Sequence, residues 1–104
     1  MIRFIEIVNE TNFNPRMERT AIPKFSLSEV WVNEKYVVSV KESLGALNLL
    51  KEGRLPDDLN GEHRFTIITT TNGTVTQSHT VVGAPEDVAE RLSRVSNRAK
   101  LLKG

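Results

Sequence analysis

Apolar residues predict three strands in the first part of the chain. Residues 1–8 are rich in Ile, Val and Phe, which suit a half-buried strand. Two further apolar stretches, 25–32 and 36–40, are separated by the short polar segment 33–35, which predicts two strands with a tight connection. In the last of these strands, period-two alternation predicts one buried face, formed by Tyr36, Val38 and Val40.

The second expected strand carries a change of phase. Phe25 and Leu27 alternate at its start, whereas Val30 and Val32 alternate at its end, one position out of step. If the strand has a single buried face, its backbone must shift by one residue to keep both apolar pairs on that face. We therefore expect a bulge or bend near Ser28–Glu29.

Helical spacing appears twice. Ser43 is a suitable N-cap for a short helix over 43–53, in which leucines recur on one side and Gly53 provides the stop. A longer helix is expected over 85–102, because Pro85 suits the first helical position and two acidic residues follow it. Its apolar stripe, expected to pack on the sheet, is Val88, Leu92, Val95, Ala99 and Leu102.

Residues 65–81 predict a β-hairpin around an Asn-Gly pair. We expect a three-residue loop, Thr71–Asn72–Gly73, because a slip of one residue exchanges the faces and only this register gathers the apolar residues on one side. The inward row is then Phe65, Ile67, Thr69, Val75, Gln77, His79 and Val81. The opposite row, expected to face water without a binding role, is Thr66, Ile68, Thr70, Thr74, Thr76, Ser78 and Thr80.

Together these elements predict an α+β fold. We expect a small, twisted antiparallel β-meander of four or five strands, with the 85–102 helix packed on one face and a short helix in the insertion 43–61. Curling toward a small barrel is the alternative. The chain reads as a single domain, 1–104, in which residues 9–24 form a long loop or arm.

Composition narrows the range of functions. The 104 residues are 38% hydrophobic and 26% charged, as in ordinary soluble proteins, and the formal net charge of +1 gives no global attraction to nucleic acid or anionic lipid. The chain has no Cys, which excludes disulfides and thiol chemistry and favours a cytoplasmic location. The first eight residues are too short and too charged for a signal segment or membrane span, so no membrane partner is expected.

Candidate chemistry is sparse, and the chain is interpreted as non-enzymatic and free of cofactors. Ser78 and His79 are neighbours, so in a strand they point to opposite faces and cannot form a nucleophile–base pair. A metal site at His63 or His79 would need a third ligand, such as Asp57 or Asp58, at no recognisable spacing. A packed or capping role is the interpretation for His79.

Two sets of residues are candidates for contact with partners. The first is a protein-binding set drawn from the arm, the strands and the insertion: Phe13, Met17, Ile22, Trp31, Leu47 and Leu50. The second is a basic set on the terminal helix, suited to phosphates or to an acidic protein surface: Arg91, Arg94, Arg98, Lys100 and Lys103. A solvated, dipole-matched helix face is the preferred explanation of the basic set.

The order of several motifs resembles a known family. Val30–Asn33, Tyr36–Glu42, Phe65–Gly73 and Val81–Leu92 are similar in sequence and order to segments of the small flagellar and swarming-motility proteins of the FlbD type, and of similar short phage proteins. The resemblance covers about half of the chain and implies a small cytoplasmic regulatory or adaptor protein that acts by contact, with no catalytic residues. The chain departs from this pattern in its arm and in its insertion.

The function expected from the sequence is therefore contact with another protein. The leading hypothesis is a non-enzymatic adaptor or inhibitor, phage-encoded, that binds a host protein or its own copies. A nucleic-acid-binding protein that uses the basic helix face is one alternative. A structural subunit of a virion or ring, with self-association through strand edges, is the other.

Overall fold

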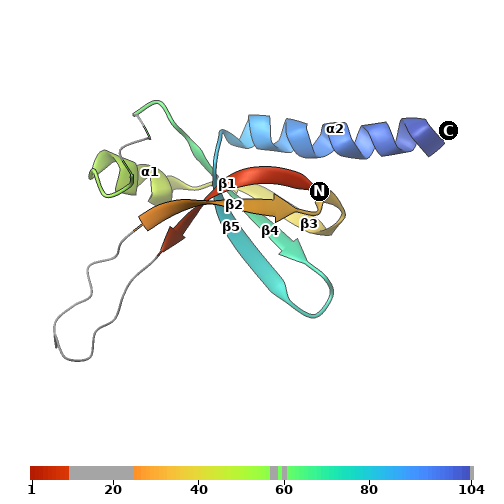
Figure 1. The fold of residues 1–104 in the computed structure, drawn as a ribbon, viewed down its shortest axis with the longest axis horizontal. Coiled ribbons are helices and arrows are strands. Elements are labelled where there is room, and N and C mark those ends of the chain that lie inside the picture. The colour runs from red at the N-terminus through yellow and green to blue at the C-terminus, as the bar shows by residue number, and fades with distance from the viewer. Residues whose placement is uncertain (10–24, 57–58, 60, 104) are drawn as a thin grey trace.

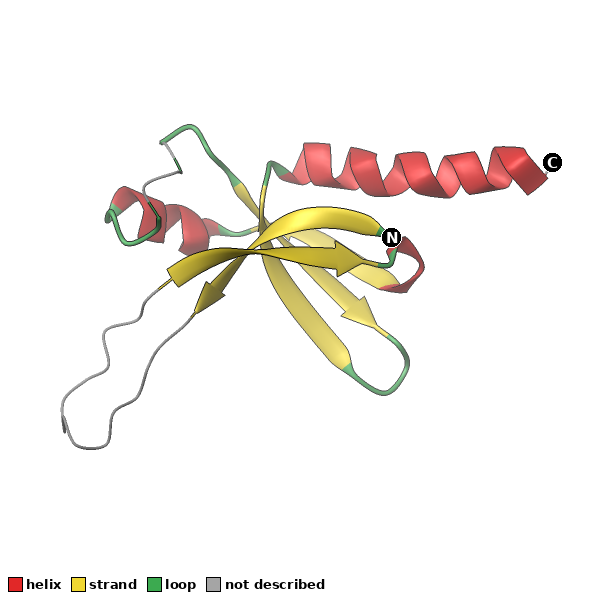
Figure 2. Ribbon diagram, in the orientation of Figure 1, coloured by secondary structure: helices red, strands yellow, loops and turns green. Residues whose placement is uncertain are grey.

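The computed structural model describes residues 1–9, 25–56, 59 and 61–103, with side chains described as far as Arg94. In this part of the chain the elements run β1 (Ile2–Asn9), β2 (Phe25–Val32), the 3₁₀ turn η2 (Glu34–Tyr36), β3 (Val37–Glu42), α1 (Leu44–Lys51), β4 (Phe65–Thr71), β5 (Thr76–Val82) and α2 (Pro85–Lys103). Figures 1 and 2 show a twisted sheet with a short helix at one end and a long helix across the other. The α+β class is confirmed.

The strands form one five-stranded sheet in the order β2-β1-β5-β4-β3, and all neighbours are antiparallel. The sheet is open, with β2 and β3 at its edges, so the barrel alternative is not what forms. The seam between β1 and β5 is narrow, with a single paired position, Glu6 opposite Val81. The sheet thus consists of a hairpin, β1–β2, joined at one point to a three-stranded unit.

A short connection requires the sheet to curl. β2 and β3 are consecutive in the chain but occupy opposite edges. In a flat five-stranded sheet these edges would lie about 19 Å apart, whereas the link from Val32 to Val37 reaches at most about 17 Å when fully extended. Because η2 shortens that link further, the two edges must approach each other at this end of the sheet.

The sheet buries both of its faces, at different places. The larger cluster lies under α2 and consists of Ile2, Phe4, Val32, Ile68, Val81, Val88 and Leu92. The smaller cluster lies under α1 and consists of Ala46, Leu55 and Phe65, with Phe25, Ile7 and Val82 among the residues packed on it. Val81 and Val82 are adjacent in β5, so they point to opposite faces and the two clusters lie on opposite sides of the sheet.

The bulge expected near Ser28–Glu29 in β2 is wrong. The apolar side of β2 changes along the strand because both faces of the sheet are buried. The pairing of β1 with β2 is regular from Ile2–Val32 to Asn9–Phe25, without a shift. Phe25 packs on the α1 cluster at the start of the strand, whereas Val30 and Val32 belong to the α2 cluster at its end. The apolar side therefore changes because the covering helix changes.

A shift in register occurs instead in β3, between Val37 and Ser39. The strand begins one residue later than expected, because Tyr36 ends the 3₁₀ turn. Val37 and Val40 pack against the α2 cluster, while Val38 is exposed. The expected buried face of Tyr36, Val38 and Val40 is thus wrong, since of these three only Val40 packs on the core.

The expected register of the β4–β5 hairpin is also wrong. Thr71 pairs with Thr76, so the loop has four residues, Asn72 to Val75, rather than three. The Asn72 side chain accepts hydrogen bonds from the amides of Thr74 (3.0 Å) and Val75 (2.9 Å), and Gly73 has a φ of 92°. This loop inverts the faces of β4 relative to β5, placing Ile68 opposite His79 and Phe65 opposite Val82.

The row of hydroxyls is correspondingly divided. Thr66, expected on the wet face, is fully buried on the α2 side, and its hydroxyl donates a 2.8 Å hydrogen bond to the carbonyl of Gly83. Ile68, from the same expected row, is also fully buried. Thr69 and Ser78 lie on the opposite face of the hairpin, away from α2, and their hydroxyls lie 3.2 Å apart.

Both helices form where the sequence predicts them. Ser43 caps α1, its hydroxyl accepting from the amide of Ala46 at 3.2 Å. α2 begins at Pro85, packs Val88 and Leu92 on the sheet, and runs beyond the edge of the sheet in Figure 1. The expected stripe residues Val95, Ala99 and Leu102 lie outside the described side chains, and the arm 9–24 lies, except for Asn9, outside the described residues.

Candidate binding cleft

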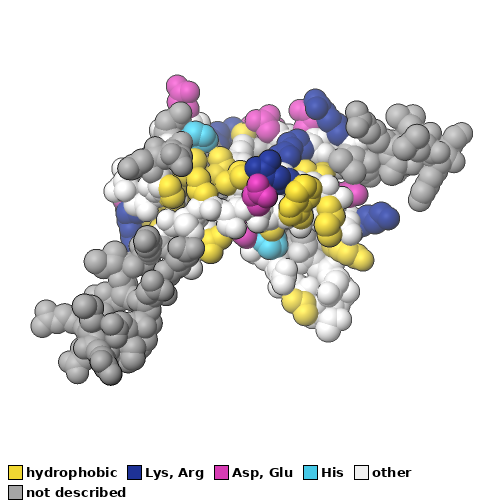
Figure 3. All heavy atoms as spheres, viewed as in Figure 1, with side chains coloured by type: hydrophobic (Ala, Val, Ile, Leu, Met, Phe, Trp, Pro, Cys, Tyr) yellow, Lys and Arg dark blue, Asp and Glu magenta, His cyan; other side chains and the backbone are white. Residues whose placement is uncertain are grey.

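A cleft opens where the end of β2 faces the β4–β5 hairpin. Its volume is about 340 Å³. Its walls and floor come from four places in the sequence that the curled sheet brings together: Met1; Trp31, Val32, Asn33 and Tyr36; Thr70, Thr71, Asn72 and Val75; and Gln77 and His79. Apolar side chains gather on this side of the molecule, over the ends of β1 and β2 (Figure 3).

The rim of the cleft is apolar and exposed. The exposed fractions are 73% for Met1, 58% for Trp31, 50% for Tyr36 and 51% for Val75. Four large apolar side chains around one hollow are unusual for a surface that faces only water, because such patches mark interaction sites. We call these four residues the rim.

Local geometry fixes the two aromatic residues of the rim. Trp31 lies in β2 directly opposite Arg3 in β1. It points away from the face on which its neighbour Val32 is buried, and its indole is exposed. Tyr36 ends η2, where the Asn33 side chain accepts from the amide of Lys35 and the Asn33 carbonyl accepts from the amide of Tyr36, both at 3.0 Å. Each aromatic ring is therefore attached to a hydrogen-bonded backbone.

The floor of the cleft is polar. Thr70, Gln77 and His79 lie on one face of the hairpin, because Thr70 pairs with Gln77 and His79 pairs with Ile68. Nδ1 of His79 lies 2.6 Å from Oε2 of Glu6, and both side chains are mostly buried. This contact ties the cleft floor to β1 beside the single β1–β5 pair, so His79 is a packed residue that anchors the floor.

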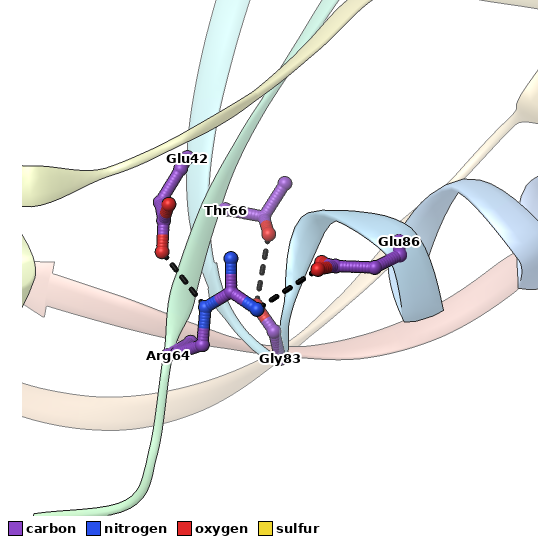
Figure 4. Close-up of polar contacts among 5 residues, drawn as sticks. All are labelled: Glu42, Arg64, Thr66, Gly83 and Glu86. Atoms are coloured by element: carbon purple, nitrogen blue, oxygen red, sulfur yellow. Dashed lines mark hydrogen bonds and ion pairs between the residues drawn. The ribbon is translucent and has the colours of Figure 1, made fainter.

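A second polar cluster lies away from the cleft and joins the end of β3 to the start of α2 (Figure 4). The guanidinium of Arg64 donates from Nε to Glu42 at 2.8 Å and from Nη1 to Glu86 at 2.9 Å. Hydrogen bonding to Arg64 lowers the pKa of Glu42; the pKa of Glu86 is lowered first by its backbone amide and then by Arg64. These carboxylates in turn raise the pKa of Arg64. The cluster fixes the start of α2 against the end of β3.

Sequence reasoning missed the Arg64 cluster and most of the cleft. Arg64 lies 22 positions from each of its two acidic partners, a separation that no helical or strand period signals. Tyr36 and Val75 gave no signal either, since each resembles an ordinary strand or turn residue. The Asn33 cap is the one local clue, because an Asn side chain that bonds the backbone two residues on favours a turn here.

The expected protein-binding residues are dispersed. Trp31 is exposed and lines the cleft. Leu47 and Leu50 are half-buried against the α1 cluster, so packing occupies them in part. Phe13, Met17 and Ile22 lie outside the described residues.

The expected basic face is partly occupied within the chain. Arg91 stacks over the ring of Phe4, 4.4 Å from its centroid, and donates to the carbonyl of Arg3 at 2.6 Å. Arg94 pairs with Glu90 at 2.5 Å. The side chains of Arg98, Lys100 and Lys103 are outside the described part. Both basic residues whose side chains are described therefore already have partners.

The described part of the chain offers neither a metal site nor a membrane-spanning helix. It contains no group of three His, Asp or Glu side chains placed to hold a metal ion. Neither of the helices in these ranges has the length and apolarity needed to cross a membrane. Asp57 and Asp58, the further ligands considered from the sequence, lie in the gap between described segments.

Comparison with known proteins gives no relative: no family model, no curated protein and no solved structure matches this chain.

Proposed function

We propose that the protein is a non-enzymatic contact protein whose cleft receives an apolar side chain from an extended segment of another protein. The observation that supports this proposal is the ring of four exposed apolar side chains around a hollow with a polar floor. Exposed Trp and Tyr beside a pocket are typical anchors of protein interfaces, where a few such residues supply most of the binding energy.

The size and charge of the cleft favour a protein segment over a charged small molecule. A volume of about 340 Å³ is at the lower end for small-molecule pockets. None of its described lining side chains is Lys, Arg, Asp or Glu, and the N-terminal ammonium of the lining residue Met1 is paired with Glu34 at 3.5 Å. The cleft therefore offers no unpaired guanidinium or ammonium group among the described residues to hold a phosphate or carboxylate. The side-chain NH₂ groups of Asn33 and Asn72, whose oxygens already accept within the chain, and the side-chain amide of Gln77 are suited to the backbone of an extended segment.

We propose that this contact serves a regulatory or adaptor role in the cytoplasm. It agrees with the expectation from the FlbD-type motifs, in which a small protein acts by contact, and a phage-encoded protein that binds a host protein is the case we favour. Chemistry at the cleft is not part of the proposal, because His79 is engaged with Glu6.

The test compares capture by matched variants. Wild type, a Tyr36→Ala/Val75→Ser variant and a Val38→Ser control are immobilised and exposed to a bacterial lysate, and retained proteins are identified by mass spectrometry. Val38 is as exposed as the rim residues but lies outside the cleft. We expect one protein to be retained by wild type and control but not by the cleft variant.

Titration of each variant with the purified candidate protein then measures how much affinity the cleft residues contribute. Loss of an aromatic anchor at an interface costs ~2 kcal/mol or more, so the dissociation constant of the cleft variant should rise about 30-fold. If the cleft variant and the control bind the candidate as tightly as wild type does, the cleft is not the contact site and the proposal fails.

A further inference from the structure

The two edges of the sheet are unequally protected. β3 is short, carries a shift in register and the exposed Lys41, and packs against α2. β2 has eight residues in unbroken register with β1, contains no Pro or Lys, and pairs with no described strand on its other side. Shifts, lysines and covering helices are the devices that prevent strand edges from pairing with another chain. The described strand β2 has neither a shift nor a Lys, and the helices contact it through residues on its faces, Phe25 on the α1 side and Val32 on the α2 side.

We propose that β2 pairs in antiparallel orientation with β2 of a second copy of this chain, around a twofold axis at Ser28. Strand addition at a free edge is an established mode of association, and a twofold contact uses the same surface on both copies. The inference concerns the β2 edge and goes beyond the contact proposed for the cleft.

Geometry limits the possible registers. A twofold axis perpendicular to the sheet keeps each face of β2 on the same side in both copies. Side chains directly opposite each other must share a face, so they are separated by an even number of positions. The axis must therefore pass through a residue rather than between two residues. For the eight residues of β2, the longest overlap arises with the axis at Ser28 or at Glu29.

Side-chain chemistry selects between these two registers. An axis at Glu29 would place two carboxylates directly opposite each other, which is destabilising. An axis at Ser28 places two small hydroxyl side chains together and brings Phe25 of each copy opposite Trp31 of the other. Aromatic cross-strand pairs are among the favourable ones, and the exposed indole of Trp31 would gain a neighbour.

The proposed contact between two β2 strands is small, so we expect a weak dimer. Pairing of two strands buries less than the roughly 1,200–2,000 Å² of a standard stable interface. The association should therefore depend on concentration, with monomers and dimers in exchange.

Disulfide trapping tests both the contact and its register. The chain contains no Cys, so Ser28→Cys introduces a single thiol. Opposed α-carbons in an antiparallel pair lie about 4.5–5.5 Å apart, within the range that a disulfide spans. Ser39→Cys is the matched control, since Ser39 is also an exposed serine on an edge strand, β3.

We expect mild oxidation to link the Ser28→Cys variant into a dimer at least about tenfold faster than the control, because paired strands hold the thiols at millimolar effective concentration. Sedimentation of wild type should show the mass rising toward twice that of the chain as concentration increases. Equal cross-linking rates, or a wild type that stays monomeric at every concentration, would overturn the proposal. Adding Tyr36→Ala to the Ser28→Cys variant should leave the cross-linking rate unchanged, which separates this test from that of the cleft.

Discussion

The cluster under α2 and the cluster under α1 stabilise the same sheet from opposite sides, but they are assembled differently. The α2 cluster gathers residues between Ile2 and Leu92, almost the full length of the described chain. The buried residues of the α1 cluster lie between Ala46 and Phe65, so one insertion and the strand that follows it form its centre. One cluster thus draws on the whole chain and the other on a local segment, and β1, β2, β4 and β5 contribute residues to both.

This difference shows where alternation along a strand fails as a guide. Alternation assigns one buried face to each strand, and it works when a single layer covers the sheet. Here the covering helix changes along the strand, so the apolar side changes with it. The step between Phe65 and Ile68 in β4 is therefore a sign of two covering elements.

The largest effects should come from removing the central aromatic residue of each cluster. Phe4 and Phe65 are 2% and 0% exposed, so Phe4→Ala and Phe65→Ala should each lower the free energy of unfolding by about 3–5 kcal/mol, measured by denaturant titration. Hydrogen exchange should separate them: Phe4→Ala exposes the amides of α2 first, and Phe65→Ala those of α1. Identical exchange patterns in both variants would show that the clusters behave as one unit.

A smaller effect is expected from the buried hydroxyl on the α2 side. Thr66→Val keeps the shape of the side chain but leaves the Gly83 carbonyl without the hydroxyl donor, which should cost about 1–3 kcal/mol of unfolding free energy. Thr66→Ser keeps the donor and is the control for it. If the Val variant is as stable as the Ser variant, the hydrogen bond does not hold the start of α2.

The cap of α1 should give a still smaller effect, confined to the local cluster. Ser43→Ala removes the acceptor for the Ala46 amide and should cost about 1 kcal/mol. Ser39→Ala, at an exposed position in β3, should change stability by less than about 0.5 kcal/mol. Thermal or denaturant unfolding checks both values, and hydrogen exchange should show faster opening of α1 with α2 unaffected.

The smallest effect should come from the Arg64 cluster, which joins β3 to α2 and is partly exposed to solvent. The pKa values of Glu42 and Glu86 lie below their ordinary value of 4.5 in the folded protein. Their stabilising contribution is therefore full above pH 4.5 and is lost as the pH falls through the folded pKa values. Unfolding measured from pH 7 to pH 3 should show a shallower loss of stability in Arg64→Met than in wild type. If stability falls equally steeply with pH in both proteins, the Arg64 cluster does not cause the pH dependence.

The sequence predicts the parts of the fold that depend on local chemistry. Pro85 and the acidic residues after it predict the start of α2, and Ser43 predicts the cap of α1, because caps act within one turn. The hairpin register failed because the Asn72 side chain caps a four-residue loop, and the choice between loops depended on which faces were buried. That choice is made by α1 and α2, which lie elsewhere in the chain.

The candidate cleft could be predicted only in part. Trp31 belongs to the expected protein-binding set, but its exposure depends on which parts of the sheet the helices cover. The opposite wall of the cleft comes from Thr70 to Val75, some forty positions away, and reaches Trp31 because the sheet curls. Pairing of β1 with β5 sets that arrangement, and no local pattern encodes it.

The single pairing of Glu6 with Val81 has a consequence for the order of folding. Every other seam of the sheet joins segments closer in sequence, whereas this one closes a loop that contains most of the chain. The entropy of closing so long a loop must be overcome before the contacts that reward it are made. We therefore expect the β1–β2 hairpin and the β3–β4–β5 unit to form early and dock late, with the approach of Glu6 to Val81 limiting the rate of folding.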